Sequence, residues 1–382
     1  MGCHPGGPSI VNIDHGELSL SELISGDAHY YLGKKVKEEF GSLPFLFKLL
    51  AAEKPLSIQA HPNLSQAQEG YQREAGLALD APHRSYKDPN HKPEIICSIT
   101  PFTGMCGFRE PGEIRDLLIK FIFPQRKMAL PAAVTEAGRT IQNIIEPLFI
   151  MLEKKDTGEA LKDFLSALFK FSPEERNHIC RYILHTGPEC LEDGLYSADN
   201  KLPLALWKTM IRFAELFPDD PALLSPLYLN LFELKPGEAL FLHAGTLHAY
   251  INGFGIELMA NSDNVLRGGL TPKHIDQGEL MRILNFIPVK PEIIRPPANA
   301  GQYTYPVQCR DFALSVIRGN GEKNTAFQMA PAICIVTSGE LEVSGKAKHG
   351  IIKTGESIFI SHSENPLFFG GKFTLYAASI PL

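Results

Sequence analysis

The chain has 382 residues, of which 44% are hydrophobic and 21% charged, and its formal net charge is −6. This length exceeds that of most single domains, so we expect two or three structural units. The acidic balance and the lack of any Lys/Arg run argue against nucleic acid as a partner, and no apolar run reaches the ~20 residues that span a membrane. Seven scattered cysteines without a C-x-x-C pair argue against a disulfide framework and favour the reducing cytoplasm.

The first hundred residues alternate short apolar runs with one or two helices. Ser19 and Glu22 have the spacing of a capping box, which predicts a helix beginning near SLSELI. The runs LPFLFKLL, LSIQAHP and KPEIICSIT follow, each bounded by Pro, Asp or Asn. Runs of this length and composition predict strands.

From about residue 110 the pattern becomes helical. PGEIRDLLIKFI and TIQNIIEPLFIMLEKK carry apolar residues at helical spacing, and SPEERNHICRYIL begins with Ser172 as N-cap and Pro173 at the first helical position. The segment PLALWKTMIRFAELF, which holds the single tryptophan Trp207, closes the block. We therefore expect a helical domain over residues 108–217.

Strand character returns after residue 225, and one segment resembles a later one. LKPGEALFLHAGTLHAY (234–250) aligns without gaps with IKTGESIFISHSENPLFF (352–369) over its first fifteen positions. A Pro-Gly-Glu turn that leads into a strand and a histidine is typical of small cupin-type barrels. The second copy has Pro366 where the first has His248, so we expect only the first barrel to bind a metal.

The predicted fold is thus mainly β with a helical insertion: two cupin-like (jelly-roll) β-barrels and an α-helical domain. The expected boundaries are residues 1–107 and 218–288 for the first, metal-binding barrel, 108–217 for the helices, and 289–382 for a C-terminal barrel without a metal site.

Polar side chains in the SIQAHP strand share one face. Residues at i, i+2 and i+4 of a strand point the same way, so Ser57, Gln59 and His61 should lie together. We expect the alternate residues, Leu56, Ile58 and Ala60, to pack on the other face. A polar face inside a barrel needs a metal or a polar ligand to satisfy it.

Two further strands repeat this geometry. Lys92 and Glu94 share a face in HKPE, as His248 and Tyr250 do in HAY. Two imidazoles, a carboxylate and an amide oxygen suit a divalent ion such as zinc. His243 is an alternative ligand to His248 on the same hairpin. We favour His248, because it alternates with Leu247 and Ala249, which are expected to pack on the opposite face of the strand. The alternative, hydrogen-bonded core residues without a metal, stays open on spacing alone. The predicted ligands are Gln59, His61, Glu94 and His248.

A polar loop, IELMANSDNVLRGGLTPKH, follows the HAY strand. It is either a solvated, salt-bridged loop or the lip of the barrel, where Arg267 and Lys273 would meet an anionic substrate.

Several long motifs, in this order, resemble those of type I mannose-6-phosphate isomerases. They are PFLFKLL with KPLSIQAHPN, YKDPNHKPE, GFR, the LKPGEALFL–HAY segment, and MANSDNVLRGGLTPKHID, and they span about residues 40–110 and 225–285. The resemblance implies a zinc enzyme that interconverts mannose 6-phosphate and fructose 6-phosphate. It also implies a catalytic cupin domain, a helical domain and a second cupin-like domain.

Carried over by motif, the resemblance assigns one Zn²⁺ to Gln59, His61, Glu94 and His248. It makes Arg267 an active-site arginine and places several other residues around the substrate: Lys48, Ser57, Lys92, Tyr250, Glu257, Asp263 and Lys273. The base that moves the proton stays open among a zinc-bound water, Lys92 and Asp263. The expected partner is a small sugar phosphate, and we expect a monomer.

One departure bears on activity. Family members usually begin several dozen residues earlier, with a Tyr-Ala-Trp-Gly stretch, whereas this chain opens at MGCHPGG. We therefore expect the first strands of the catalytic barrel to be absent. Two other hypotheses stay open: a non-catalytic sugar-binding cupin that keeps the metal site, and an iron cupin oxygenase with a two-histidine, one-carboxylate site.

Overall fold

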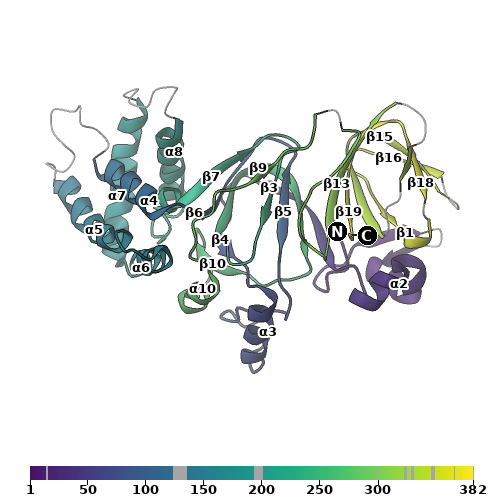
Figure 1. Ribbon diagram of the computed structural model, residues 1–382, viewed down its shortest axis with the longest axis horizontal. Coiled ribbons are helices and arrows are strands. Elements are labelled where there is room, and N and C mark those ends of the chain that lie inside the picture. The colour runs from purple at the N-terminus through teal and green to yellow at the C-terminus, as the bar shows by residue number, and fades with distance from the viewer. Residues whose placement is uncertain are drawn as a thin grey trace.

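The computed structural model describes residues 1–13, 16–123, 136–192, 201–298, 300–321, 325–327, 331–345, 349–364 and 366–381. Three parts follow one another in a row: a block of helices, a nearly closed barrel-like sheet, and a second sheet (Figure 1). The coarse prediction, strands and helices with a helical insertion, is confirmed. Among the described residues, no helix has both the length and the apolar character needed to cross a membrane.

The N-terminal segment forms a hairpin and two helices. The hairpin consists of β1 (Ile10–Ile13) and β2 (Gly16–Ser19), and the helices are α1 (Leu20–Gly26) and α2 (Ala28–Phe40). The predicted capping box is confirmed, because Ser19 Oγ accepts from the Glu22 amide at 3.1 Å and Glu22 accepts from the Ser19 amide at 3.2 Å. The buried faces of both helices pack into the same core as residues of the second sheet.

The first sheet has nine strands, and one of them, the long strand β9 (His248–Ala260), organises the others. β9 pairs with four others, so it fixes their relative positions. The three predicted strands are present as β3 (Phe45–Ala52), β4 (Ile58–Ala60) and β5 (Glu94–Ser98). The remaining members are β6 (Phe102–Phe108), β7 (Leu229–Leu234), β8 (Ala239–Leu242), β10 (Leu266–Gly269) and β11 (Ile293–Ile294), with short helices α3 (Leu64–Arg73), α9 (Ser225–Tyr228) and α10 (Gln277–Ile283) beside them.

The helical block follows β6. Its helices are α4 (Pro111–Ile122), α5 (Glu136–Leu152), α6 (Thr157–Phe169), α7 (Pro173–Glu192) and α8 (Lys201–Leu216). Ser172 caps α7 as predicted, since its Oγ accepts from the Glu175 amide at 3.2 Å. The Trp207 ring stacks on that of Phe121 with centroids 5.3 Å apart, and this contact joins α8 to α4.

The second sheet is built from eight strands. They are β12 (Gln302–Thr304), β13 (Ala313–Asn320), β14 (Thr325–Phe327), β15 (Ala332–Ser344), β16 (His349–Lys353), β17 (Ser357–Ile360), β18 (Leu367–Gly370) and β19 (Lys372–Ser379). Ile256 and Leu258 of β9 share one hydrophobic core with Phe312, Val316 and Tyr376 of this sheet and its preceding loop. The two sheets therefore pack directly against each other.

The internal sequence similarity appears as the same turn in both sheets. Before β8, the Lys235 amide donates to Glu238 Oε2 at 2.8 Å, and Gly237 has φ 87°. Before β17, the Lys353 amide donates to Glu356 Oε2 at 2.7 Å, and Gly355 has φ 89°. A positive φ at this turn position favours glycine in both copies.

Replacing Gly355 by alanine is expected to destabilise the protein by about 1–2 kcal/mol, because a left-handed backbone strains a residue with a Cβ. Gly350 is the matched control: both positions have open space for a Cβ, but only Gly355 has a positive φ. Gly350→Ala is therefore expected to be neutral within about 0.5 kcal/mol. Chemical denaturation measures both, and equal effects would contradict the turn assignment.

Candidate metal centre

Strand register brings three of the predicted site residues into one row. Gln59 on β4 lies opposite Arg267 on β10 and, on its other side, opposite His248 on β9. Directly opposed residues of antiparallel strands share a face of the sheet. Ile58 and Ala60, on the other face of β4, are completely buried in the core, as the alternation predicts.

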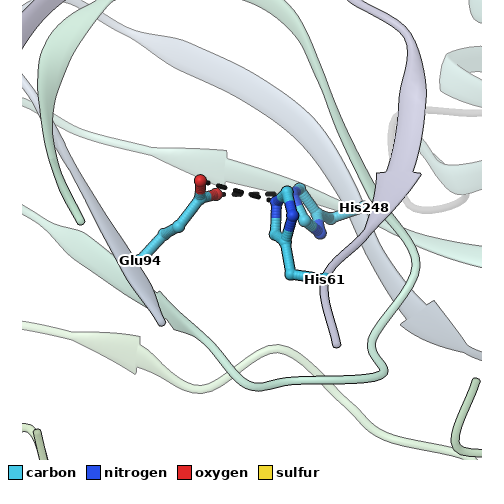
Figure 2. Close-up of side chains that lie close together, drawn as sticks. All are labelled: His61, Glu94 and His248. Atoms are coloured by element: carbon cyan, nitrogen blue, oxygen red, sulfur yellow. Dashed lines mark ion pairs between the residues drawn. The ribbon is translucent and has the colours of Figure 1, made fainter. Parts of the chain in front are cut away.

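Two histidines and one carboxylate converge next to this row. His61 Nε2 lies 3.4 Å from Glu94 Oε1, and His248 Nε2 lies 3.5 Å from Glu94 Oε2. Figure 2 shows both imidazoles facing the carboxylate. All three side chains are at most 3% exposed, and one ligand atom of each lies within 4.8 Å of the others. The Gln59 amide nitrogen is 3.4 Å from His248 Nε2, so all four predicted ligands lie together.

Backbone carbonyls fix the proton on each imidazole. His61 Nδ1 lies 2.7 Å from the Asn264 carbonyl oxygen, and His248 Nδ1 lies 3.0 Å from that of Thr246. A carbonyl only accepts, so each Nδ1 must carry a hydrogen and donate. Burial and the nearby Lys92 lower the pKa of His61 to about 4, so this ring is neutral at pH 7 and its Nε2 carries a lone pair. This is the orientation that outer hydrogen bonds impose on metal-binding histidines.

The atoms that face one another are therefore electron-pair donors. His61 Nε2 and both Glu94 carboxylate oxygens are buried and form no hydrogen bond in the described structure, although Glu94 Oε1 has Lys92 Nζ at 3.1 Å as an ion-pair partner. Despite burial, Lys92 and His61 keep the pKa of Glu94 well below its usual value, so its charge is retained. Lone pairs and an anion that converge in a buried space favour a bound cation, and the Lys92 ammonium supplies one to only one Glu94 oxygen. Imidazole, carboxylate and amide donors suit zinc or a similar divalent ion.

Two lysines lie beside the carboxylates of the site. Lys92 Nζ is 3.1 Å from Glu94 Oε1, so these residues share a face as predicted. Lys48 Nζ is 3.1 Å from Glu257 Oε2. Burial and the Glu94 charge raise the pKa of Glu257, while burial and the Glu257 charge raise the pKa of Tyr250 well above its usual value. Tyr250 is therefore a neutral hydroxyl at physiological pH.

The other predicted residues lie farther out. Ser57 is half-buried just before β4, and Asp263 is 58% exposed on the loop after β9. Lys273 is exposed, and in the part of the chain that the structure describes its side chain forms no ion pair with the other predicted site residues. His243 is also exposed, whereas His248 is buried, so the preference for His248 holds.

One packing prediction was wrong. Leu56 is 38% exposed instead of packing beside Ile58. It precedes β4, and its amide is held by the Tyr250 carbonyl at 2.8 Å, so strand alternation does not yet apply to it.

Sequence reasoning missed two contributors. His4 Nε2 lies 3.1 Å from Asp263 Oδ2, which brings the MGCHP segment to the polar loop. Asn264 is completely buried; its carbonyl accepts from His61, and its side chain donates to the carbonyls of Asp88 and Asn90. The MGCHP motif could have pointed to His4, but a backbone acceptor leaves no signal in a sequence.

Comparison with known proteins supplies the family. The sequence model described as phosphomannose isomerase type I, catalytic domain, matches residues 1–111. The mannose-6-phosphate isomerase of Escherichia coli is 36% identical over 376 residues, which cover 97% of this chain and 88% of that protein. This chain belongs to the type I phosphomannose isomerase family. The human mannose-6-phosphate isomerase is 35% identical over 296 residues, which cover 75% of this chain and 63% of that protein.

Solved phosphomannose isomerases share the fold over the whole chain. A mutant form of the Salmonella typhimurium enzyme has a TM-score of 0.83 at 35% identity, covering 100% of this chain and 90% of that one. A zinc-bound mannose 6-phosphate isomerase gives the same TM-score, identity and coverage.

Proposed function

We propose that this chain is a zinc-dependent aldose–ketose isomerase that interconverts mannose 6-phosphate and fructose 6-phosphate. The observation that carries the proposal is the buried convergence of two imidazole lone pairs on a carboxylate, in a chain that belongs to this family. The zinc-bound relative supports the choice of metal. Gln59, His61, Glu94 and His248 would hold one Zn²⁺.

When bound, zinc supplies a Lewis acid that stabilises negative charge as it develops on a sugar oxygen. The reaction moves hydrogen between two adjacent carbons of the open-chain sugar and needs no external oxidant. We assign Arg267 to the anionic groups of the substrate, since a guanidinium binds phosphate or a developing oxyanion through paired hydrogen bonds. Lys92 and Asp263 are the two side chains that we propose for proton transfer.

We propose that five more residues contact the substrate. Lys48 and Glu257 form a charged pair from neighbouring strands, and such a pair can bind hydroxyl groups and phosphate. Tyr250 offers a neutral hydroxyl donor from β9. The proposed substrate-binding residues are Lys48, Ser57, Tyr250, Glu257 and Lys273, with Lys273 restricted to the rim because it is exposed.

A coupled assay tests the function directly. The purified chain, with its zinc content measured by mass spectrometry, is expected to convert mannose 6-phosphate to fructose 6-phosphate, while mannose without the phosphate should react far more slowly. One zinc per chain without turnover would contradict the proposal and favour a non-catalytic sugar-binding cupin. Bound iron together with oxygen consumption would instead favour an oxygenase.

We also infer the architecture and setting from the family. The proposed domains are a catalytic cupin barrel (1–107 and 218–288), a helical domain (108–217) and a second cupin-like jelly-roll barrel (289–382) without a metal site. The turn repeated before β8 and β17 supports two related barrels. We propose a cytoplasmic monomer whose product mannose 6-phosphate supplies GDP-mannose synthesis and glycosylation.

A further inference from the structure

A strained turn follows the strand that carries Arg267. β10 ends at Gly269, and Leu270 comes next with φ 54°. In the described parts of the chain, Leu270 is the only non-glycine residue with positive φ. Leucine avoids this conformation because its Cβ approaches the following carbonyl oxygen. Such a conformation persists only where the surrounding structure holds it, and it is often found at functional sites.

A carboxylate from the helical side of the molecule holds this turn. Asp220 lies between α8 and α9 and is 8% exposed. Its Oδ2 accepts from the Thr271 amide, the residue directly after Leu270, at 3.2 Å. Its Oδ1 accepts from the Ala222 amide at 2.9 Å. Asp220 thus bridges two backbone segments that are far apart in sequence.

The two segments approach so closely that no side chain fits between them. Gly269 has φ 143°, and a Cβ on it would lie 2.3 Å from Ala222 Cβ and 2.7 Å from Asp220 Oδ1. The ladder between β10 and β4 shifts register between Arg267 and Gly269, and beyond this irregularity only the Gly269–Ile58 pair holds the end of β10. The contact with Asp220 and Ala222 therefore adds to this single pair in holding the end of the strand.

We propose that Asp220 is a positioning residue for Arg267, an inference that rests on the role given to Arg267 in the proposed function. Asp220 pins the turn at Leu270, three residues after Arg267, and so fixes the backbone of Arg267 at its position opposite Gln59 in the ladder. The metal-centre histidines are oriented by Asn264 and Thr246 instead. Loosening the turn should therefore misplace Arg267 while the metal stays bound.

The test is Asp220→Asn, which keeps the shape but replaces one accepting oxygen by a donor. We expect kcat for mannose 6-phosphate to fall about 10- to 100-fold, as small misplacements of a reacting group do, with one zinc per chain retained. Asp276→Asn is the control, because Asp276 accepts from the Glu279 amide at 2.9 Å at the start of α10 and, among the described residues, forms no hydrogen bond with the Leu270 turn. Its kcat should equal that of the unmodified chain.

A double mutant separates positioning from general stability. In an Arg267→Ala background, Asp220→Asn should leave kcat unchanged, because its effect acts through the missing guanidinium. Three results would overturn the proposal: Asp220→Asn lowers kcat equally in both backgrounds, the variant loses zinc, or the single variant keeps an unchanged kcat. If Asp220→Asn does not fold, Asp220→Ser takes the same test, and failure of both to fold overturns it as well. An unmodified chain that does not isomerise mannose 6-phosphate instead refutes the proposed function.

Discussion

Replacing His248 by alanine is expected to empty the metal centre. The Nε2 lone pair of this buried ring is one of the donors that face Glu94, and in the described structure no histidine besides His61 and His248 joins the group. We expect zinc to fall from one ion per chain to less than about a tenth of that. The kcat should fall at least about 100-fold. Loss of an outer-shell partner of a metal ligand costs up to about 100-fold, and loss of a ligand itself should cost no less. Metal analysis and the coupled assay on one preparation measure both.

His243 provides the matched control for this variant. It precedes the same strand but is exposed, with its ring against Phe241. His243→Ala should therefore keep both zinc and turnover. Full zinc occupancy in His248→Ala, or loss of zinc in His243→Ala, would show that the ligands are not those assigned above.

Replacing Arg267 by alanine is expected to lower kcat about 100- to 1,000-fold, the usual cost of removing one group that stabilises charge in a transition state. Arg267 lies opposite Gln59 in the ladder, but its guanidinium is always protonated and has no lone pair to bind a metal ion. Zinc content should therefore stay at one per chain. Steady-state kinetics with metal analysis distinguishes this result from that of His248→Ala.

Arg295 is the control for charge alone. It is 64% exposed and pairs with Glu238 at 2.9 Å, at the turn before β8. Arg295→Ala should change kcat by less than about twofold, since exposed ion pairs contribute little. If kcat of Arg267→Ala also changed by less than about twofold, Arg267 would have no role in the reaction.

The alternation of side chains along strands predicted the parts of the site that lie on regular strands. The period of two put Gln59 and His61 together and buried Ile58 and Ala60, because β4 is a regular strand in a barrel-like sheet. Capping residues predicted where helices begin, as at Ser19 and Ser172. These signals are local, and a sequence carries local signals well.

The parts that escaped prediction depend on contacts between distant segments. The Asn264 carbonyl that orients His61 and the Asp220 carboxylate that holds Leu270 act through backbone groups. Any residue type supplies a carbonyl or an amide hydrogen, so no pattern of side chains marks these partners. His4 and Asp263 meet across 259 positions of sequence, a distance over which no spacing rule applies.

The hydrophobic core shared by the two sheets has a consequence for how the chain can be divided. Ile256 and Leu258 lie on the strand that begins with a proposed zinc ligand, and they share one hydrophobic core with Phe312 and Tyr376 from beyond residue 300. Truncating the chain near residue 300 would expose these apolar side chains to water. We therefore expect an isolated metal-binding fragment to aggregate and not to work as a minimal enzyme. Among its described residues, the C-terminal sheet has no group of histidines, cysteines and carboxylates that could hold a metal ion. Its retention would then be explained by the apolar surface of β9 that its removal would expose to water.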